Sequence, residues 1–108
     1  MPKYLLVVSY TAEGAKGVLK DGGTARRDAA AKAAQSVGAK MDAFYFAFGS
    51  ADVYVILDAP DHASAAAISL AVSSSGAVAT KTIVLIEPSE IDAAAQKAGT
   101  LDYRPPGS

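Results

Sequence analysis

The sequence predicts one α+β domain, a ferredoxin-like β-α-β-β-α-β sandwich with a four-stranded antiparallel sheet and its helices on one face. The first observation behind this is the segment 40–58, KMDAFYFAFGSADVYVILD. Its two aromatic and β-branched runs flank a Gly-Ser-Ala-Asp break, which is a strand-turn-strand pattern. An alanine-rich segment of helical spacing lies on each side of this hairpin. The length of 108 residues suits a single domain.

Each predicted element has a recognisable start or stop. Thr11 is suited to cap the first helix, and Gly22 with Gly23 ends it. Gly38 is expected to end the second helix in a left-handed conformation, and Asp61 to cap the third. Strands are predicted over 3–10, 40–48, 52–58 and 77–87, and helices over 11–21, 24–37, 62–75 and 89–98. The predicted spatial order of the strands is 4-1-3-2.

Both faces of this predicted sheet are apolar. The helices can cover only one of them, and the narrow, polar arm at 100–108 is poorly suited to cover the other. We therefore expect a homodimer or higher homo-oligomer, in which the open faces of two sheets pack together. A monomer with the arm folded over the sheet is the alternative. Phe44, Phe46 and Phe48 alternate on one face and are expected in the sheet core or the dimer interface. Residues 1–99 form the expected domain, and 100–108 the extended arm.

Composition excludes several classes of function. Ten basic residues against eleven acidic ones leave no electrostatic footprint for nucleic acid or an anionic membrane. The absence of cysteine removes disulfides and thiolate sites. The amino-terminal apolar run is short and lacks a cleavage site, and no run approaches a membrane span, so we expect a cytoplasmic protein. We expect neither nucleic acid nor a membrane as a partner.

Four segments, distributed over nearly the whole chain, share a family pattern: SYTAEGAKGVLKDGGTARRDAA, AFYFAFGSADVYVILD, AISLAVSSSGAVATKT and YRPPG. In them the chain resembles the GYD domain family of the dimeric α+β barrel superfamily. That resemblance implies the same fold and a dimer, but no particular reaction. Ala51 is a departure, because the family usually has Tyr directly before the Asp of its namesake motif. Any role of that ring is absent here or carried by another residue.

Some polar side chains interrupt the apolar and small-residue segments. Arg26 and Arg27 follow a glycine turn at the start of a helix, which suits an anion. The alternative is a solvated charged face, with one arginine paired to Asp28, Asp21 or a partner subunit. Asp52 either closes the hairpin turn through backbone bonds or places a carboxylate at the rim of a cavity. The candidate ligand-binding residues are Tyr10, Lys16, Arg27, Tyr45, Asp52 and Lys81.

Tyr10 and Tyr45 are expected on neighbouring strands, where their hydroxyls would orient a small polar ligand near Asp52, or their rings would simply pack. Lys81 is either an edge-strand charge or the partner of Asp52 or of a ligand carboxylate. His62, the one histidine, is expected as a helix-terminus residue, with a general base as the alternative. Neither a metal-ligand cluster nor a phosphate-binding glycine motif occurs, so no metal and no cofactor are expected.

Three functions are compatible with these features. The favoured one is a homo-oligomer that binds a small polar or anionic ligand between sheet and helices. The second is a cofactor-independent enzyme of the monooxygenase, isomerase or decarboxylase kind, which the resemblance implies and in which Asp52 with Tyr45 or His62 would transfer a proton. The third is an assembly module whose arm, 100–108, docks on a neighbouring subunit. The residues leave open whether the protein is catalytic, so no catalytic residue is assigned.

Overall fold

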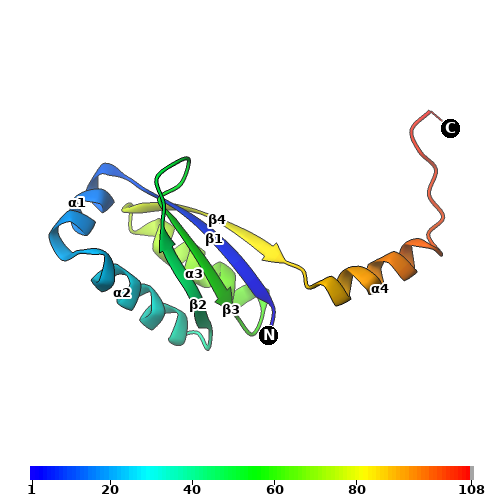
Figure 1. The fold of residues 1–108 in the computed structure, drawn as a ribbon, viewed down its shortest axis with the longest axis horizontal. Helices are drawn as coiled ribbons and strands as arrows, with labels where there is room; N and C mark the ends of the chain where they lie inside the picture. The colour runs from blue at the N-terminus through cyan, green and yellow to red at the C-terminus, as the bar shows by residue number, and fades with distance from the viewer. Residues whose placement is uncertain (108) are drawn as a thin grey trace.

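A computed structural model describes residues 1–107 and confirms the ferredoxin-like order of elements (Figure 1). Ser108, the last residue of the predicted arm, lies outside the described residues. The strands are β1 (Lys3–Tyr10), β2 (Lys40–Phe46), β3 (Val53–Asp58) and β4 (Val78–Leu85). The helices are α1 (Ala12–Asp21), α2 (Gly23–Gln35), α3 (His62–Ser74) and α4 (Pro88–Ala98).

The four strands form one antiparallel sheet in the order β2-β3-β1-β4, as predicted. The two central strands build the core because their inward positions alternate: Leu6 and Val8 of β1 lie beside Val53 and Val55 of β3 on the covered face. The helices α2 and α3 cover this face and bury Ala34 and Ile68 in the same cluster as the strand residues. The helices therefore share one face of the sheet, as the sequence predicts.

Local capping signals work as expected. The side chain of Thr11 accepts a hydrogen bond from the backbone N–H of Gly14 at 3.2 Å. Asp61 does the same for the N–H of Ser64 at 2.7 Å. Gly38 has a φ of 75° after α2, a left-handed conformation that costs a glycine little. These contacts begin α1 and α3 and end α2 close to the predicted positions.

The hairpin strands are shorter than predicted. β2 ends at Phe46 rather than at residue 48, and β3 begins at Val53. The N–H of Ala47 donates to the carbonyl of Asp52 at 2.8 Å, so the six-residue segment 47–52 closes as a loop. Phe48 lies in this loop and is fully exposed, so the expectation that it shares a strand face with Phe44 and Phe46 is wrong.

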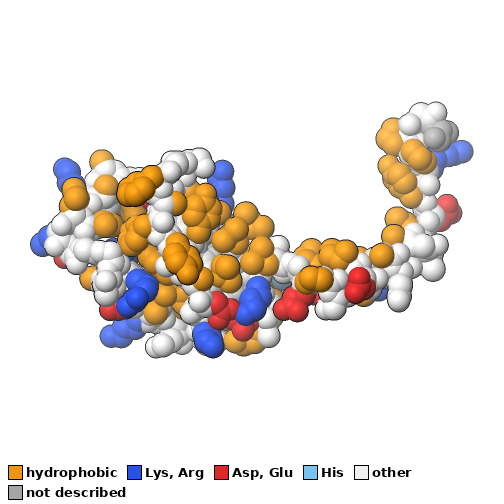
Figure 2. Space-filling view, in the orientation of Figure 1, with side chains coloured by type: hydrophobic (Ala, Val, Ile, Leu, Met, Phe, Trp, Pro, Cys, Tyr) orange, Lys and Arg blue, Asp and Glu red, His pale blue; other side chains and the backbone are white. Residues whose placement is uncertain are grey.

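The uncovered face of the sheet carries apolar side chains, as predicted. Leu5 and Val7 of β1 face this side together with Tyr54 of β3 and Ile83 of β4, their partners across the ladder. Tyr54 is 37% exposed and Ile83 46% exposed. Figure 2 shows hydrophobic side chains gathered over the strands and continuing along α4. This surface is called the open face below.

The last helix does not join the domain. None of residues 88–98 is buried, and α4 with the arm after it extends beyond the end of the sheet (Figure 1). The chain consequently spans 57 × 33 × 22 Å. A capping box between Glu87 and Glu90, with Pro88 in the first turn, begins the helix. The start of α4 is therefore set by local sequence alone.

Candidate functional site

A cavity of about 120 Å³ lies between the sheet and the helices. It exists because α2 faces the strands here mainly with alanines, which leave space over the sheet. Most of its wall is apolar and comes from all four strands and from α3, with Phe44 and Ile68 among the larger side chains. Three polar residues also line it: Tyr10, Arg26 and Thr80.

The cavity adjoins an open cleft of about 350 Å³ between α1, the start of α2 and the end of α3. Tyr10 and Arg26 line both spaces and so lie at their boundary. Glu13 and Asp21 line the outer cleft, where they add negative charge farther from the cavity. Arg26 forms no ion pair with any residue of the described range 1–107. The arrangement is an apolar pocket with one arginine, not paired to an acid within residues 1–107, at its boundary with the cleft.

Asp52 forms hydrogen bonds with the backbone of β1. Its carboxylate accepts a hydrogen bond from the N–H of Tyr10 at 2.7 Å, and its own N–H donates to the carbonyl of Val8 at 2.8 Å. These bonds attach the hairpin loop to the end of β1. The carboxylate thus binds the backbone of β1 and not that of its own turn, which differs from the turn-closing interpretation. Asp52 does not line the cavity.

The other candidates lie apart from one another. Lys16 is exposed on α1, and Arg27 is exposed on α2, where it pairs with Asp28 at 3.1 Å. Tyr45 is 72% exposed on β2, opposite Tyr54 on the open face. Of the six candidates only Tyr10 lines the cavity, so the predicted set does not converge at one point.

One predicted neighbourhood is wrong. Tyr10 and Tyr45 do not lie on adjacent strands, because β3 lies between β1 and β2 in the sheet. Lys81 is exposed on β4, which is an edge strand, as the edge-strand interpretation predicts. It lies beside Val7 on the open face and lines a small hollow with Ser9 and Ala51.

Arg26 and Thr80 are the cavity residues that the candidate set missed. Arg26 precedes Ala29 and Ala33 by three and seven positions, so helical periodicity places it on the inward stripe of α2. Thr80 lies two positions after the buried Val78 on β4, and its hydroxyl is 2.7 Å from that of Ser69. Helical and strand spacing, applied to the polar residues as well as the apolar ones, would have found both.

His62 forms a hydrogen bond with the hydroxyl of a buried tyrosine. Its Nδ1 is 2.5 Å from the hydroxyl of Tyr4, a residue that is 1% exposed, and the two rings meet edge to face. This agrees with the helix-terminus interpretation of His62. Tyr4 and Tyr10 are six residues apart on β1, about 20 Å along the strand. Asp52, bound at Tyr10, and His62, bound at Tyr4, are thus at opposite ends of β1 and form no proton-transfer pair.

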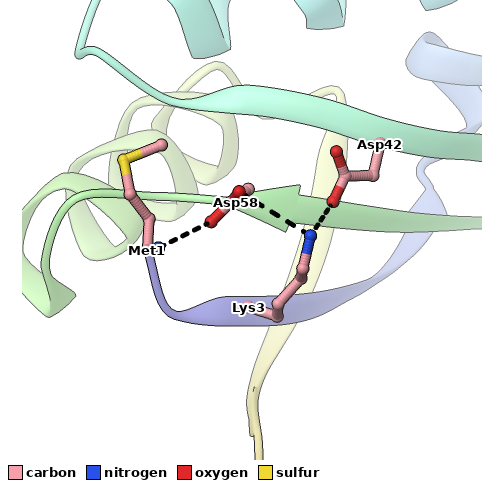
Figure 3. Close-up of polar contacts among 4 residues, drawn as sticks. All are labelled: Met1, Lys3, Asp42 and Asp58. Carbon is pink, nitrogen blue, oxygen red and sulfur yellow. Dashed lines mark hydrogen bonds and ion pairs between the residues drawn. The ribbon is translucent and has the colours of Figure 1, made fainter. Parts of the chain in front are cut away.

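A cluster of charges closes one end of the sheet (Figure 3). The ammonium of Lys3 pairs with Asp42 and lies 3.7 Å from Asp58, and the amino terminus lies 3.7 Å from the other oxygen of Asp58. The hydrogen bond between Lys3 and Asp42 raises the pKa of the ammonium and lowers the pKa of the carboxyl. Asp42 occupies the bulge of β2, so the cluster secures an irregular edge strand.

Within residues 1–107, no group of three or more His, Cys, Asp or Glu side chains is placed to hold a metal ion. In the same range, no helix has the length and hydrophobicity needed to cross a membrane.

Comparison with known proteins identifies a family. The model of the GYD domain matches residues 4–95, which include every strand and most of α4. Neither a curated protein nor a solved structure matches the chain significantly. Because the match extends over most of its length, this chain belongs to the GYD domain family.

Proposed function

We propose that this protein binds a small carboxylate with an apolar body in the cavity between sheet and helices. The observation that carries this proposal is that Arg26 lines both the apolar cavity and the open cleft and has no ion-pair partner among residues 1–107. A ligand in this orientation would bury its apolar part against Phe44 and Ile68 and direct its anionic group to Arg26. Tyr10 lines the same two spaces, and its hydroxyl would serve as a second donor.

The cavity volume restricts the ligand's apolar part. An apolar protein cavity of about 150 Å³ accommodates one benzene ring. A cavity of about 120 Å³ therefore suits a single ring or a short branched chain, provided that the anionic group extends into the cleft. Arginine favours planar carboxylates because its fork matches both oxygens. Benzoate, phenylacetate and 3-methylbutanoate are the probes that follow from this geometry.

Ligand titration monitored by NMR tests the proposal, with benzamide as the neutral analogue of benzoate. A hydrogen bond to a charged group is worth about 1.5–3 kcal/mol, so Arg26→Gln should weaken benzoate binding roughly 10- to 100-fold. It should leave benzamide binding nearly unchanged. Arg27→Gln is the matched control, since Arg27 is exposed and paired with Asp28. The proposal is wrong if no carboxylate binds, or if the two arginine variants lose affinity equally.

Filling the cavity provides a second test. Ala33 lines the cavity from α2, and a leucine in its place would occupy space that the ligand needs. Ala33→Leu should abolish carboxylate binding and raise the stability of the free protein by about 0.5–2 kcal/mol. Binding that persists unchanged in this variant would place the ligand elsewhere.

The proposed binding unit is a homodimer joined through the open face. An exposed apolar sheet is unfavourable in a monomer, and the similarity to the dimeric α+β barrel type supports face-to-face pairing of two sheets. Multi-angle light scattering should give about twice the chain mass of 10.9 kDa. Ile83→Glu, on the open face, should lower that mass, whereas Leu19→Glu, on exposed α1, should not. A monomeric wild-type protein, or equal behaviour of the two variants, would count against this pairing.

A further inference from the structure

The outward side of α3 is poorly suited to water. Its 13 residues include no Lys, Arg, Asp or Glu. Ala63, Ala66 and Ala67 are exposed there, and Leu70 is 72% exposed. Helices at a protein surface usually turn charged or polar side chains outward. This side of α3 therefore favours contact with another apolar surface.

A groove runs beside this surface. It lies between α3 and β4, has a volume of about 420 Å³, and is lined by Ala66 and Leu70 on one side and by Thr82 and Val84 on the other. Val84 is 51% exposed although it belongs to a strand. This hollow and the outward side of α3 are together called the α3 groove. It lies on the helix side of the sheet, away from the open face.

The chain also carries a helix that matches this groove. Ile91, Ala94, Ala95 and Ala98 lie on one side of α4, because they are three or four residues apart. Ile91 is 52% exposed, and Leu101, just after the helix, is 69% exposed. An isolated helix of 11 residues is only marginally stable in water, so α4 needs a packing partner.

The path of the chain directs α4 away from its own domain. Only two residues separate β4 from α4, and Pro88 restricts Glu87 to an extended conformation, with φ −73° and ψ 151°. No glycine occurs between Gly76 and Gly99 that would ease a tight reversal. In Figure 1, α4 accordingly continues outward from the end of β4.

We infer that α4 of one copy docks in the α3 groove of a second copy, and that α4 of the second copy docks in the α3 groove of the first. Such an exchange closes a two-fold pair without new elements. Each copy would supply both an arm and a groove, so the apolar contact of Ile91, Ala94 and Leu101 with the groove is made twice in the pair. α3 supplies no charge to this contact, and Glu90, Asp92 and Lys97 of α4 flank the side that carries Ile91 and Ala94, so they would keep access to water.

Disulfide trapping tests this contact, since the chain has no native cysteine. Leu70→Cys and Ala94→Cys are made in separate chains, mixed, and oxidised mildly. Both sites are exposed, so folding should be unaffected. We expect a hetero-disulfide at several times the level given by the control pair Leu70→Cys with Gln96→Cys, because Gln96 lies on the opposite side of α4.

Three outcomes overturn the inference. They are the absence of a hetero-disulfide, equal trapping of the two pairs, and a double variant, Leu70→Cys with Ala94→Cys, that links only within one chain. The wild-type protein offers a further check by hydrogen exchange. Amides of α4 should exchange at least about tenfold more slowly at high than at low protein concentration, and coil-like rates at both would also refute docking. Neither result depends on the cavity ligand or on Ile83.

Discussion

Two glycines of α1 should respond in opposite ways to the same substitution. Alanine is favoured over glycine inside a helix by about 0.8–1 kcal/mol. A Cβ added at Gly17 meets no atom within 4 Å, so Gly17→Ala should raise the free energy of unfolding by about 0.5–1 kcal/mol. A Cβ at Gly14 would lie 2.0 Å from the carbonyl oxygen of Ala77, far inside contact distance.

The clash at Gly14 falls on a junction that holds α1 against the start of β4. The carbonyl oxygen of Ala77 accepts hydrogen bonds from the N–H of Thr11 at 3.0 Å and from its hydroxyl at 3.1 Å. Moving α1 away strains both, at about 1 kcal/mol each, and overpacking adds about 1–3 kcal/mol. After the helix-propensity gain, Gly14→Ala should destabilise the protein by about 2–4 kcal/mol.

Urea unfolding of both variants, followed by far-UV circular dichroism, measures the difference. In thermal unfolding, about 4–8 °C per kcal/mol predicts a fall in Tm of roughly 8–32 °C for Gly14→Ala. Gly17→Ala should melt above the wild type. If Gly14→Ala proves as stable as Gly17→Ala, then the close approach of α1 to Ala77 is wrong, and so is the shape of the cleft that α1 borders.

Three further predictions concern the core, the first helix cap and acid stability. Leu57→Ala removes a side chain that is 2% exposed and should cost about 2–5 kcal/mol in urea unfolding; a loss below 1 kcal/mol would contradict its burial. Thr11→Val keeps the shape of the side chain but removes the oxygen that caps α1, so it should lower the free energy of unfolding by about 1 kcal/mol. Amide hydrogens of α1 should then exchange faster with solvent, and an unchanged exchange rate would refute the capping role. The hydrogen bond from the backbone N–H of Ser64 lowers the pKa of Asp61 from its ordinary value of 3.8. The ionised carboxylate therefore stabilises the folded protein above pH 3.8, and this stabilisation is lost as the pH falls through the lowered pKa. Between about pH 5 and pH 2, the range in which such a group protonates, Asp61→Asn should therefore lose less unfolding free energy than the wild type. Parallel curves of unfolding free energy against pH for the two proteins would contradict this.

Much of the fold is predictable because its signals are local. The alternation in β1, the cap at Thr11 and the left-handed Gly38 each depend on neighbouring residues, and the structure has them as predicted. The hairpin ends were less predictable. Phe48 has the composition of a strand residue, yet the bond from Ala47 to Asp52 closes the loop before it. Strand propensity describes a residue and not its ladder partner, so it overextends a strand at its ends.

The site was predictable only in outline. A cavity between sheet and helices was expected, and alanine-rich α2 supplies the reason for it. The six candidates were chosen by residue type and turn position, so they were distributed over both faces of the sheet. Arg26 was overlooked in favour of Arg27, although the two differ by 100° around the helix axis and only the former points along the inward stripe.

The sequence by itself determined the order of elements, their caps and the apolar character of both sheet faces, because these depend on spacing along the chain. Only the tertiary structure decided that Asp52 binds the backbone of Tyr10, 42 residues away, and that His62 serves Tyr4. It also decided that Tyr45 faces away from the cavity and that α4 stands clear of the domain. Such contacts depend on which strands become neighbours and on how closely small side chains let helices approach, and no local pattern encodes either.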